Sequence, residues 1–388
     1  MPITKKKIAI ISINAHTRVL NFASPLHSYA FQKFLTKHRI KSVIVDYKPC
    51  YYKEFDVRHP YDHYLKHPKE NPDDQKKTLE FWKNLYDARE KRFDRFQEFI
   101  DKYYIKTDKC YNQNTLDTED IGCDIYMSVT DVLWKYHKQS GFDRGYFLAC
   151  DSMKGKTKIA YAASKGAGKY ADMPRKQAIE YINDTDYVSC REESLQRFVN
   201  KNTNKKAALV LDPVFLQKAS FYKRLAIRPK EKGYLLLYAV MDDAHTLADE
   251  ALKFAKKEGL DVIDVSDDLT ISYISPYGER KAIYDIGIEE WLGYMLNAKY
   301  IFTNSFHCCC FSIIFKKVFF VGKRGGDKIT SLLKQFDLDD RRLEHNKGVY
   351  TEKNYPSKEI DFAPVHEKLK IRRKESITWL FDTLKNCN

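Results

Sequence analysis

The feature that most constrains the fold is an alternation of short apolar runs with stretches of helical periodicity along almost the whole chain. The first run, KKIAIISI (6–13), is followed by a helical stretch from Ser24 to about His38 and then by the run SVIVDY (42–47). Apolar runs of about four to eight residues separated by helices are typical of the buried strands of a parallel sheet. The sequence therefore predicts an α/β fold.

The apolar runs fall into two groups, and 388 residues are more than one ordinary core accommodates. The first group is 6–13, 42–47, 123–129, 158–164, 187–190 and 207–212, and the second is 233–240, 261–265, 299–304 and 318–322. We expect two Rossmann-like domains facing a cleft. The expected parts are an N-terminal α/β domain over 1–217, a linker over 218–231, a C-terminal α/β domain over 232–365, and a C-terminal helix over 366–388.

A segment of different composition interrupts the first domain. Residues 50–110 are rich in Tyr, Lys, Asp and His, and apolar side chains recur at helical spacing over 74–104. We expect a helical insertion of one long helix or two short ones. Its apolar face could pack on the core or lie against a membrane or a partner.

The net charge of +14 admits three kinds of partner: nucleic acid, an anionic membrane surface or a phosphorylated substrate. The cations are spread along the chain, and no zinc-finger or RNP pattern accompanies them, so we expect no nucleic acid. No apolar run reaches the roughly 18 residues of a spanning helix, and the basic N-terminus lacks a signal-peptide pattern. We expect a cytoplasmic protein, with peripheral contact at the inner membrane face as a further option.

The stretch TNSFHCCCFSIIF (303–315) places His307 between a predicted strand and a predicted helix. Ligands of open parallel sheets bind beyond the carboxyl ends of the strands. Asn304 or Ser305 can cap the helix, whose N-terminus favours an anion. His307 is therefore a candidate acid/base residue, and a packed core histidine is the alternative.

The cysteines of this stretch predict packing rather than metal or redox chemistry. Consecutive residues on a helix point about 100° apart, so Cys308, Cys309 and Cys310 cannot chelate one ion together. No CxxC pair occurs among the nine cysteines. We expect no metal site.

Six short blocks then show a resemblance that extends over nearly the whole chain. They are NFA (21–23), CDIYMSVTDVLW (123–134), KIAYAASKGAG (158–168), VSCREESLQRF (188–198), VLDPVFL (210–216) and the helix–strand–TNSFH–helix segment that starts at Ile288. In this order they resemble the polysaccharide pyruvyltransferase family. The family often has a basic residue where this chain has Ser305.

The resemblance implies a fold like that of the GT-B glycosyltransferases and a transfer of pyruvate from phosphoenolpyruvate to a sugar. The product would be a pyruvate ketal on a bacterial surface polysaccharide or its lipid-linked precursor, with His307 as acid/base and phosphoenolpyruvate as co-substrate without another cofactor. Ser305 keeps a nucleotide-sugar glycosyltransferase open as an alternative. A basic, non-catalytic scaffold at the membrane is a third hypothesis.

A donor with a carboxylate and a phosphate requires cations. Arg191, which follows the predicted strand 187–190, matches the family's arginine for the donor anion, and an ion pair with Glu192 or Glu193 is its alternative. Lys323, Arg324 and Lys328 lie in a Gly-containing turn that could cradle phosphate, beside Asn304 and Ser305. For the sugar acceptor we expect Asn21, Asp131 and Glu290, each of which could instead cap a loop or helix.

Overall fold

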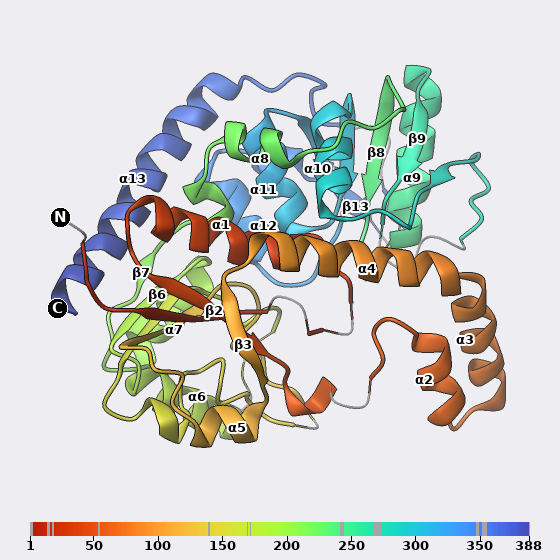
Figure 1. The fold of residues 1–388 in the computed structure, drawn as a ribbon. Helices are drawn as coiled ribbons and strands as arrows, with labels where there is room; N and C mark the ends of the chain where they lie inside the picture. The colour runs from red at the N-terminus through yellow and green to blue at the C-terminus, as the bar shows by residue number, and fades with distance from the viewer. Residues whose placement is uncertain are drawn as a thin grey trace.

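The structure is a computed structural model that describes residues 3–13, 16–17, 19–52, 55–138, 140–168, 170, 172–240, 244–266, 273–346, 349–350 and 355–387. Its framework is a seven-stranded and a five-stranded parallel sheet, each flanked by helices, with a long C-terminal helix alongside both (Figure 1). The predicted α/β class with two Rossmann-like sheets and a C-terminal helix is confirmed.

The first sheet has the strand order β3-β2-β1-β4-β5-β6-β7. Its strands are β1 (Ile8–Ile11), β2 (Ser42–Tyr47), β3 (Lys106–Tyr111), β4 (Ile125–Val129), β5 (Thr157–Ala163), β6 (Tyr187–Cys190) and β7 (Ala208–Leu209). Helix α1 (Ala23–Lys37) covers one face, and α6 (Asp172–Asn183) and α7 (Glu193–Asn202) cover the other. Because side chains alternate along a strand, Ile8 and Ile10 meet α1 while Ala9 and Ile11 face the opposite layer.

The second sheet has the order β10-β9-β8-β11-β12. Its strands are β8 (Tyr234–Tyr238), β9 (Asp261–Asp264), β10 (Lys281–Ala282), β11 (Tyr300–Thr303) and β12 (Val318–Val321). Helix α9 (Ala244–Glu258) packs on one face, while α10 (Ile288–Asn297), α11 (Phe306–Phe315) and α12 (Lys328–Gln335) pack on the other. The remaining short elements are α5 (Gln113–Thr118), β13 (His345–Asn346), β14 (Val349–Tyr350) and four 3₁₀ turns, η1 (Cys50–Tyr52), η2 (Asp151–Met153), η3 (Pro213–Leu216) and η4 (Asp339–Arg341).

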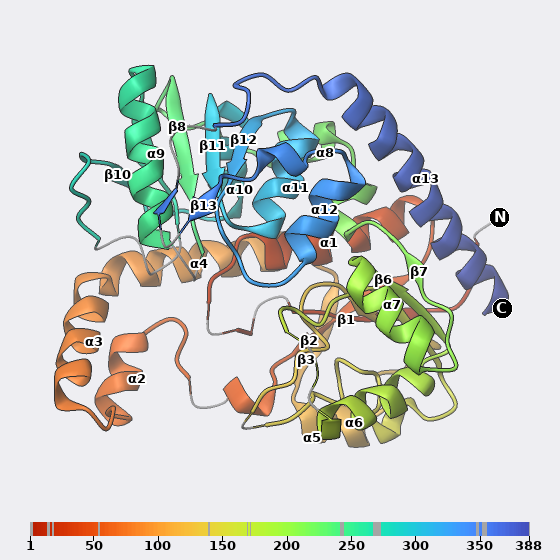
Figure 2. The same cartoon turned by 180° about the vertical axis from the view of Figure 1, so that it is seen from behind.

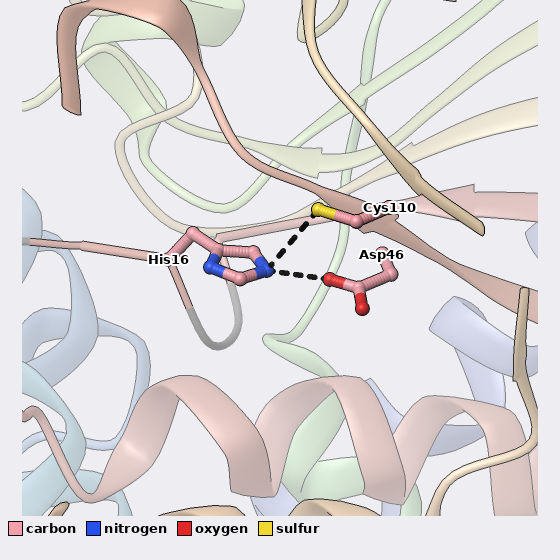
Figure 3. A group of neighbouring side chains, drawn as sticks. All are labelled: His16, Asp46 and Cys110. Carbon is pink, nitrogen blue, oxygen red and sulfur yellow. Dashed lines mark hydrogen bonds and ion pairs between the residues drawn. The ribbon is translucent and has the colours of Figure 1, made fainter. Parts of the chain in front are cut away.

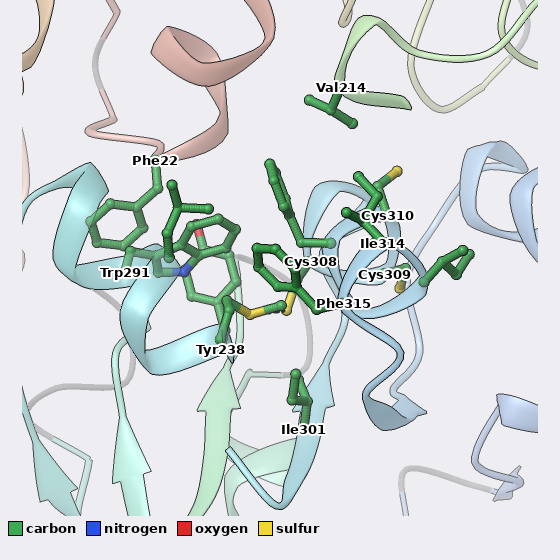
Figure 4. Close-up of a cluster of buried hydrophobic side chains, with 14 of the residues drawn as sticks. Phe22, Val214, Tyr238, Trp291, Ile301, Cys308, Cys309, Cys310, Ile314 and Phe315 are labelled. Carbon is green, nitrogen blue, oxygen red and sulfur yellow. Dashed lines mark hydrogen bonds between the residues drawn. The ribbon is translucent and has the colours of Figure 1, made fainter. Parts of the chain in front are cut away.

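One apolar core joins elements of both halves of the chain. Phe22, at the start of α1, stacks on Trp291 of α10 with ring centroids 5.5 Å apart (Figure 4). Cys308, Cys309 and Cys310 are fully buried in the same core, where burial raises the pKa of each thiol. The interpretation of these cysteines as packing residues is thus supported, since a buried neutral thiol behaves as a small hydrophobe.

The helical insertion consists of α2 (Pro60–Lys66), α3 (Pro72–Asn84) and α4 (Tyr86–Tyr103), with α2 and α3 projecting from the body in Figures 1 and 2. Helix α4 connects the two halves, because the buried Arg92 donates to the carbonyl of Leu20 at 3.1 Å and to that of Ser266 at 3.3 Å. The predicted insertion extended to about residue 110, but Lys106–Tyr111 forms strand β3. This edge strand is largely polar and exposed, so it lacks the apolar run of the other strands.

Two segment boundaries differ from the prediction. The basic stretch expected as a linker contains helix α8 (Ala219–Leu225), because Tyr222 is fully buried with its ring against Phe311. Helix α13 (Phe362–Asn386) starts before the predicted residue 366, since the Asp361 side chain accepts the Ala363 N–H and caps it. The domain boundaries themselves stay a prediction.

Helix α13 runs alongside both halves, as Figure 2 shows. Its Val365 and Leu369 belong to the shared core, whereas Leu380 and Leu384 pack under the first sheet. Within the described ranges, no helix combines the length and apolarity needed to cross a membrane.

Candidate functional site

His307 lies in the first turn of α11, immediately after strand β11. The Ser305 hydroxyl caps this helix by accepting the Cys308 N–H at 3.5 Å. The His307 side chain is almost fully buried, and its Nε2 lies 3.4 Å from Oδ2 of Asp212. A histidine beside a carboxylate at a helix N-terminus can hold or release a proton in a place that also favours an anion.

Asp212 and Asp131 hold Arg191 between them. Nη1 of Arg191 donates to Asp212 Oδ2 at 2.8 Å, and Nη2 donates to Asp131 Oδ1 at 2.8 Å. The guanidinium also covers the Phe306 ring at 4.3 Å. All three charged side chains are buried, and opposite charges this close compensate each other's loss of hydration.

Charge pairing fixes the ionisation of this group. Burial alone would raise the pKa of Asp131, but Arg191 and Lys328 hold that pKa far below its ordinary value. Burial likewise opposes ionisation of Asp212, yet His307 and Arg191 lower its pKa strongly. Burial would lower the pKa of Arg191, and the two carboxylates raise it instead. The cluster therefore carries fixed charges at neutral pH.

The backbone around this cluster is strained. Thr130 and Asp131 have φ angles of 50° and 63°, and Ala162 on the adjacent strand has 52°. Left-handed backbone is uncommon for residues other than glycine; aspartate adopts it more readily than most, whereas a β-branched threonine there is an outlier. This conformation lets the Thr130 hydroxyl contact Asp212 Oδ2 at 3.0 Å and the Ala162 carbonyl at 3.1 Å. Such strain clusters at functional sites.

His27 of α1 lies against His307, and the two rings stack with centroids 5.6 Å apart. Its Nδ1 lies 3.4 Å from the Ser12 hydroxyl and 3.3 Å from that of Ser28, whereas Nε2 has no hydrogen-bond partner among the described residues. Burial and the neighbouring His307 lower the pKa of His27 to about 4. His27 is therefore neutral at physiological pH.

Lys328 brings a further cation to the cluster from the start of α12. Burial lowers the pKa of its ammonium to about 8, against the opposing effect of Asp131. Glu192, next to Arg191, has a pKa raised by burial, with its Oε2 3.5 Å from Arg191 Nε. The ion pair with Glu192 that was the alternative for Arg191 thus exists, as a weaker contact than those with the two aspartates.

The other predicted donor residues surround the ends of β8, β11 and β12. The Asn304 carboxamide oxygen accepts the Val240 N–H at 2.8 Å, and Nη1 of Arg324 donates to the Val240 carbonyl at 2.8 Å. Lys323 is exposed, and its backbone N–H donates to the Tyr350 hydroxyl at 2.8 Å. Asn304 and Arg324 therefore both contact the backbone of Val240, which follows strand β8.

Among the predicted acceptor residues, Asp131 alone has contacts with the buried charge cluster in the part of the chain that the structure describes. The Asn21 carboxamide oxygen accepts the Ala23 N–H at 3.0 Å in the turn that leads into α1. Helix α1 begins at Ala23, one residue before the predicted start at Ser24. Glu290 accepts from the Gly287 N–H at the start of its own helix and pairs with Arg95 of α4. These contacts match the alternative interpretation of Asn21 and Glu290, in which each residue caps a loop or a helix.

Sequence reasoning missed His27 and Asp212 as members of the site. Asp212 ends the predicted strand 207–212 and precedes Pro213, so a carboxylate at a strand end was a usable signal. His27 has no comparable signal, because a lone histidine within a buried helix resembles a packing residue.

The model of the family described as polysaccharide pyruvyl transferase matches residues 26–321, which include His27, Asp131, Arg191, Asp212 and His307. No curated protein matches the sequence.

Solved structures give the fold. A glycosyltransferase from Rickettsia africae superposes with a TM-score of 0.51 at 10% identity, covering 98% of this chain and 99% of the other. A UDP-N-acetylglucosamine 2-epimerase from Rickettsia bellii gives 0.47 at 10% identity, covering 98% and 96%. Identity this low shows the GT-B-like fold alone.

The family match spans most of the chain, includes the buried charge cluster and agrees with the sequence blocks around it; this chain belongs to the polysaccharide pyruvyl transferase family.

Proposed function

We propose that the protein transfers pyruvate from phosphoenolpyruvate to two hydroxyls of one sugar, forming a ketal and releasing phosphate. The observation that carries the proposal is the placement of His307 in the first turn of α11, 3.4 Å from the ionised Asp212. In its protonated form the ring can serve as a proton donor. The family membership supports the transferase class.

The chemistry requires one proton on carbon and one on phosphate. His307 donates a proton to the methylene carbon, which becomes the methyl group, and the central carbon gains oxocarbenium character. The first sugar hydroxyl adds to that carbon, and its proton returns to the imidazole. The second hydroxyl then displaces phosphate, which leaves with the C–O bonding pair and takes up the second hydroxyl's proton.

Binding the negatively charged donor requires cationic side chains. Arg191 is engaged by Asp131 and Asp212, so its proposed part in donor binding is to contribute positive potential and hold both carboxylates in place. Lys328 and Arg324, with Lys323 nearby, are proposed to contact the phosphate and carboxylate of the donor. Asn304 and Ser305 would shape the anion site at the start of α11.

For the acceptor we propose a sugar on a surface polysaccharide precursor, entering from the first-sheet side past Asn21 and Asp131. Glu290 is a weaker candidate, because its carboxylate already pairs with Arg95. If the acceptor is lipid-linked, the +14 charge would hold the protein peripherally at an anionic membrane.

The test combines binding with turnover. Phosphoenolpyruvate should raise the thermal midpoint of the wild type, and incubation with sugars that carry suitable diols should release phosphate and give the methyl proton signal of a ketal. His307→Gln should retain the thermal shift and lose turnover. A thermal shift with a nucleotide sugar and none with phosphoenolpyruvate would overturn the proposal in favour of a glycosyltransferase.

A further inference from the structure

We propose that His16, Asp46 and Cys110 form a binding site for a transition-metal ion, with Zn²⁺ as the best match, at the edge of the first sheet. This inference is independent of the pyruvyl transfer proposed above. It replaces our expectation, drawn from sequence spacing, that the chain has no metal site.

The register of the sheet brings two of the ligands together. Asp46 of β2 and Cys110 of β3 are directly paired residues in the parallel ladder, so their side chains leave the sheet on the same face. Both are the fifth residue of a six-residue strand, near its carboxyl end. His16 reaches them from the loop that follows β1, as Figure 3 shows.

The three ligand atoms already lie close to one another. Nε2 of His16 is 2.5 Å from Oδ1 of Asp46 and 3.7 Å from Sγ of Cys110, and all three atoms lie within 4.8 Å. In a tetrahedral zinc site with bonds of about 2.0–2.3 Å, neighbouring ligand atoms are about 3.3–3.6 Å apart. The histidine–cysteine spacing fits, and the histidine–aspartate hydrogen bond would open as both atoms bind the ion.

The ligand set selects the class of metal. Thiolate, imidazole and carboxylate together are typical of Zn²⁺, whereas Mg²⁺ and Ca²⁺ prefer oxygen ligands alone. The thiolate is the form that binds the ion, so the S–metal bond forms as the thiol proton leaves to solvent. A cavity of about 30 Å³ lined by His16, Asp46 and Lys106 leaves space for a water as the remaining ligand.

The surroundings support the aspartate in this role. Oδ2 of Asp46, which faces away from His16, lies 3.8 Å from Nζ of Lys106, and the Asp46 backbone N–H donates to the Thr107 hydroxyl at 3.0 Å. These contacts orient the carboxylate so that Oδ1 is directed at the other two ligands. An ion here would tie the loop after β1 to the ends of β2 and β3, which is a structural role.

The test uses the full chain, stripped with a chelator and titrated with Co²⁺ as a spectroscopic probe. The wild type should bind one equivalent with visible d–d bands and a thiolate-to-metal charge-transfer band. Cys110→Ser should lose the charge-transfer band, while Cys50→Ser, which changes another exposed cysteine, should keep it. Three results would each overturn the proposal. They are loss of the charge-transfer band in Cys50→Ser, persistence of this band in Cys110→Ser, and no stoichiometric Co²⁺ binding by the wild type.

Two further variants separate ligation from folding, with circular dichroism of the metal-free proteins as the check. His16→Ala and Asp46→Asn should each weaken Zn²⁺ binding by at least about 100-fold in a chelator competition, which exceeds the 10–100-fold loss typical of an outer partner. Zn²⁺ should raise the thermal midpoint of the wild type and not that of Cys110→Ser. Unchanged Zn²⁺ affinity in both His16→Ala and Asp46→Asn would also overturn the site.

Discussion

His27 and His307 stack on each other with ring centroids 5.6 Å apart, although they belong to distant parts of the sequence. One belongs to the first helix of the seven-stranded sheet and the other to a helix of the five-stranded sheet. His307 lies beside the ionised Asp212, while His27 meets only hydroxyl groups at its Nδ1. The protein thus keeps one ring of the pair neutral next to a ring that can accept charge.

The neutral state of His27 predicts a specific pH dependence of stability. Its pKa is about 4 in the folded protein and 6.5 when unfolded, so the unfolded state binds the extra proton. Stability should be full above pH 6.5 and fall toward pH 4, by about 3 kcal/mol in total from this group. Urea unfolding at several pH values should show this slope of the free energy of unfolding against pH. In His27→Gln the slope should be less steep by up to about 1.4 kcal/mol per pH unit. Equal slopes in the two proteins would contradict the assignment.

Arg191 should be critical to folding as well as to the site. Arg191→Ala leaves Asp131 and Asp212 as buried charges without a cation, and breaking a buried pair in this way costs about 3–5 kcal/mol. Adding Asp131→Asn to that variant should recover part of the loss, because one of the two charges is removed. The measurement is the free energy of unfolding in urea.

The matched control for Arg191 is Arg197→Ala. Arg197 is exposed and pairs with Glu193 on the helix surface at 3.2 Å, so its loss should cost less than about 1 kcal/mol. If Arg191→Ala and Arg197→Ala lower the free energy of unfolding by similar amounts, the buried ion pairs contribute no more to stability than the exposed one.

The sequence pattern predicts the two sheets well, because each strand buried on both faces is an uninterrupted apolar run, as in LLLY (235–238). It fails at β3, whose polar residues pair at an edge, and at α8, where Tyr222 is buried and Phe221 and Leu225 are only partly buried against the core. His307 was found because it follows a strand, whereas Asp131 and Arg191 were found because they follow strands within blocks that resemble the family. His27 was missed, and the proximity of His16, Asp46 and Cys110 was not foreseen, since only the folded arrangement brings such distant residues together.

Asp212 should be needed for the proposed proton transfer by His307. Its Oδ2 accepts from Arg191 and Thr130 and faces His307 Nε2 at 3.4 Å. Asp212→Asn keeps the shape of the side chain but removes the negative charge that pairs with Arg191 and faces the His307 ring. The rate of phosphate release should fall in Asp212→Asn, and in His307→Gln it should fall by about 10²–10⁴-fold. A wild-type rate in Asp212→Asn would remove Asp212 from the proton-transfer step.

Lys328 should make donor binding sensitive to pH in the alkaline range. Its ammonium has a pKa of about 8 because of burial, so in the free protein it loses its proton as the pH rises through 8. The affinity for phosphoenolpyruvate should fall over the same interval, since a neutral amine no longer attracts the anion.

Lys328→Met should bind phosphoenolpyruvate weakly at all pH values without this inflection. Lys328→Arg should keep its positive charge and therefore bind without the inflection as well. Lys334→Met changes an exposed lysine of the same helix and should titrate like the wild type. Calorimetric titrations at pH 6.5 to 9.5 measure the inflection, and a wild-type affinity that stays constant across this range would show that Lys328 does not contact the donor.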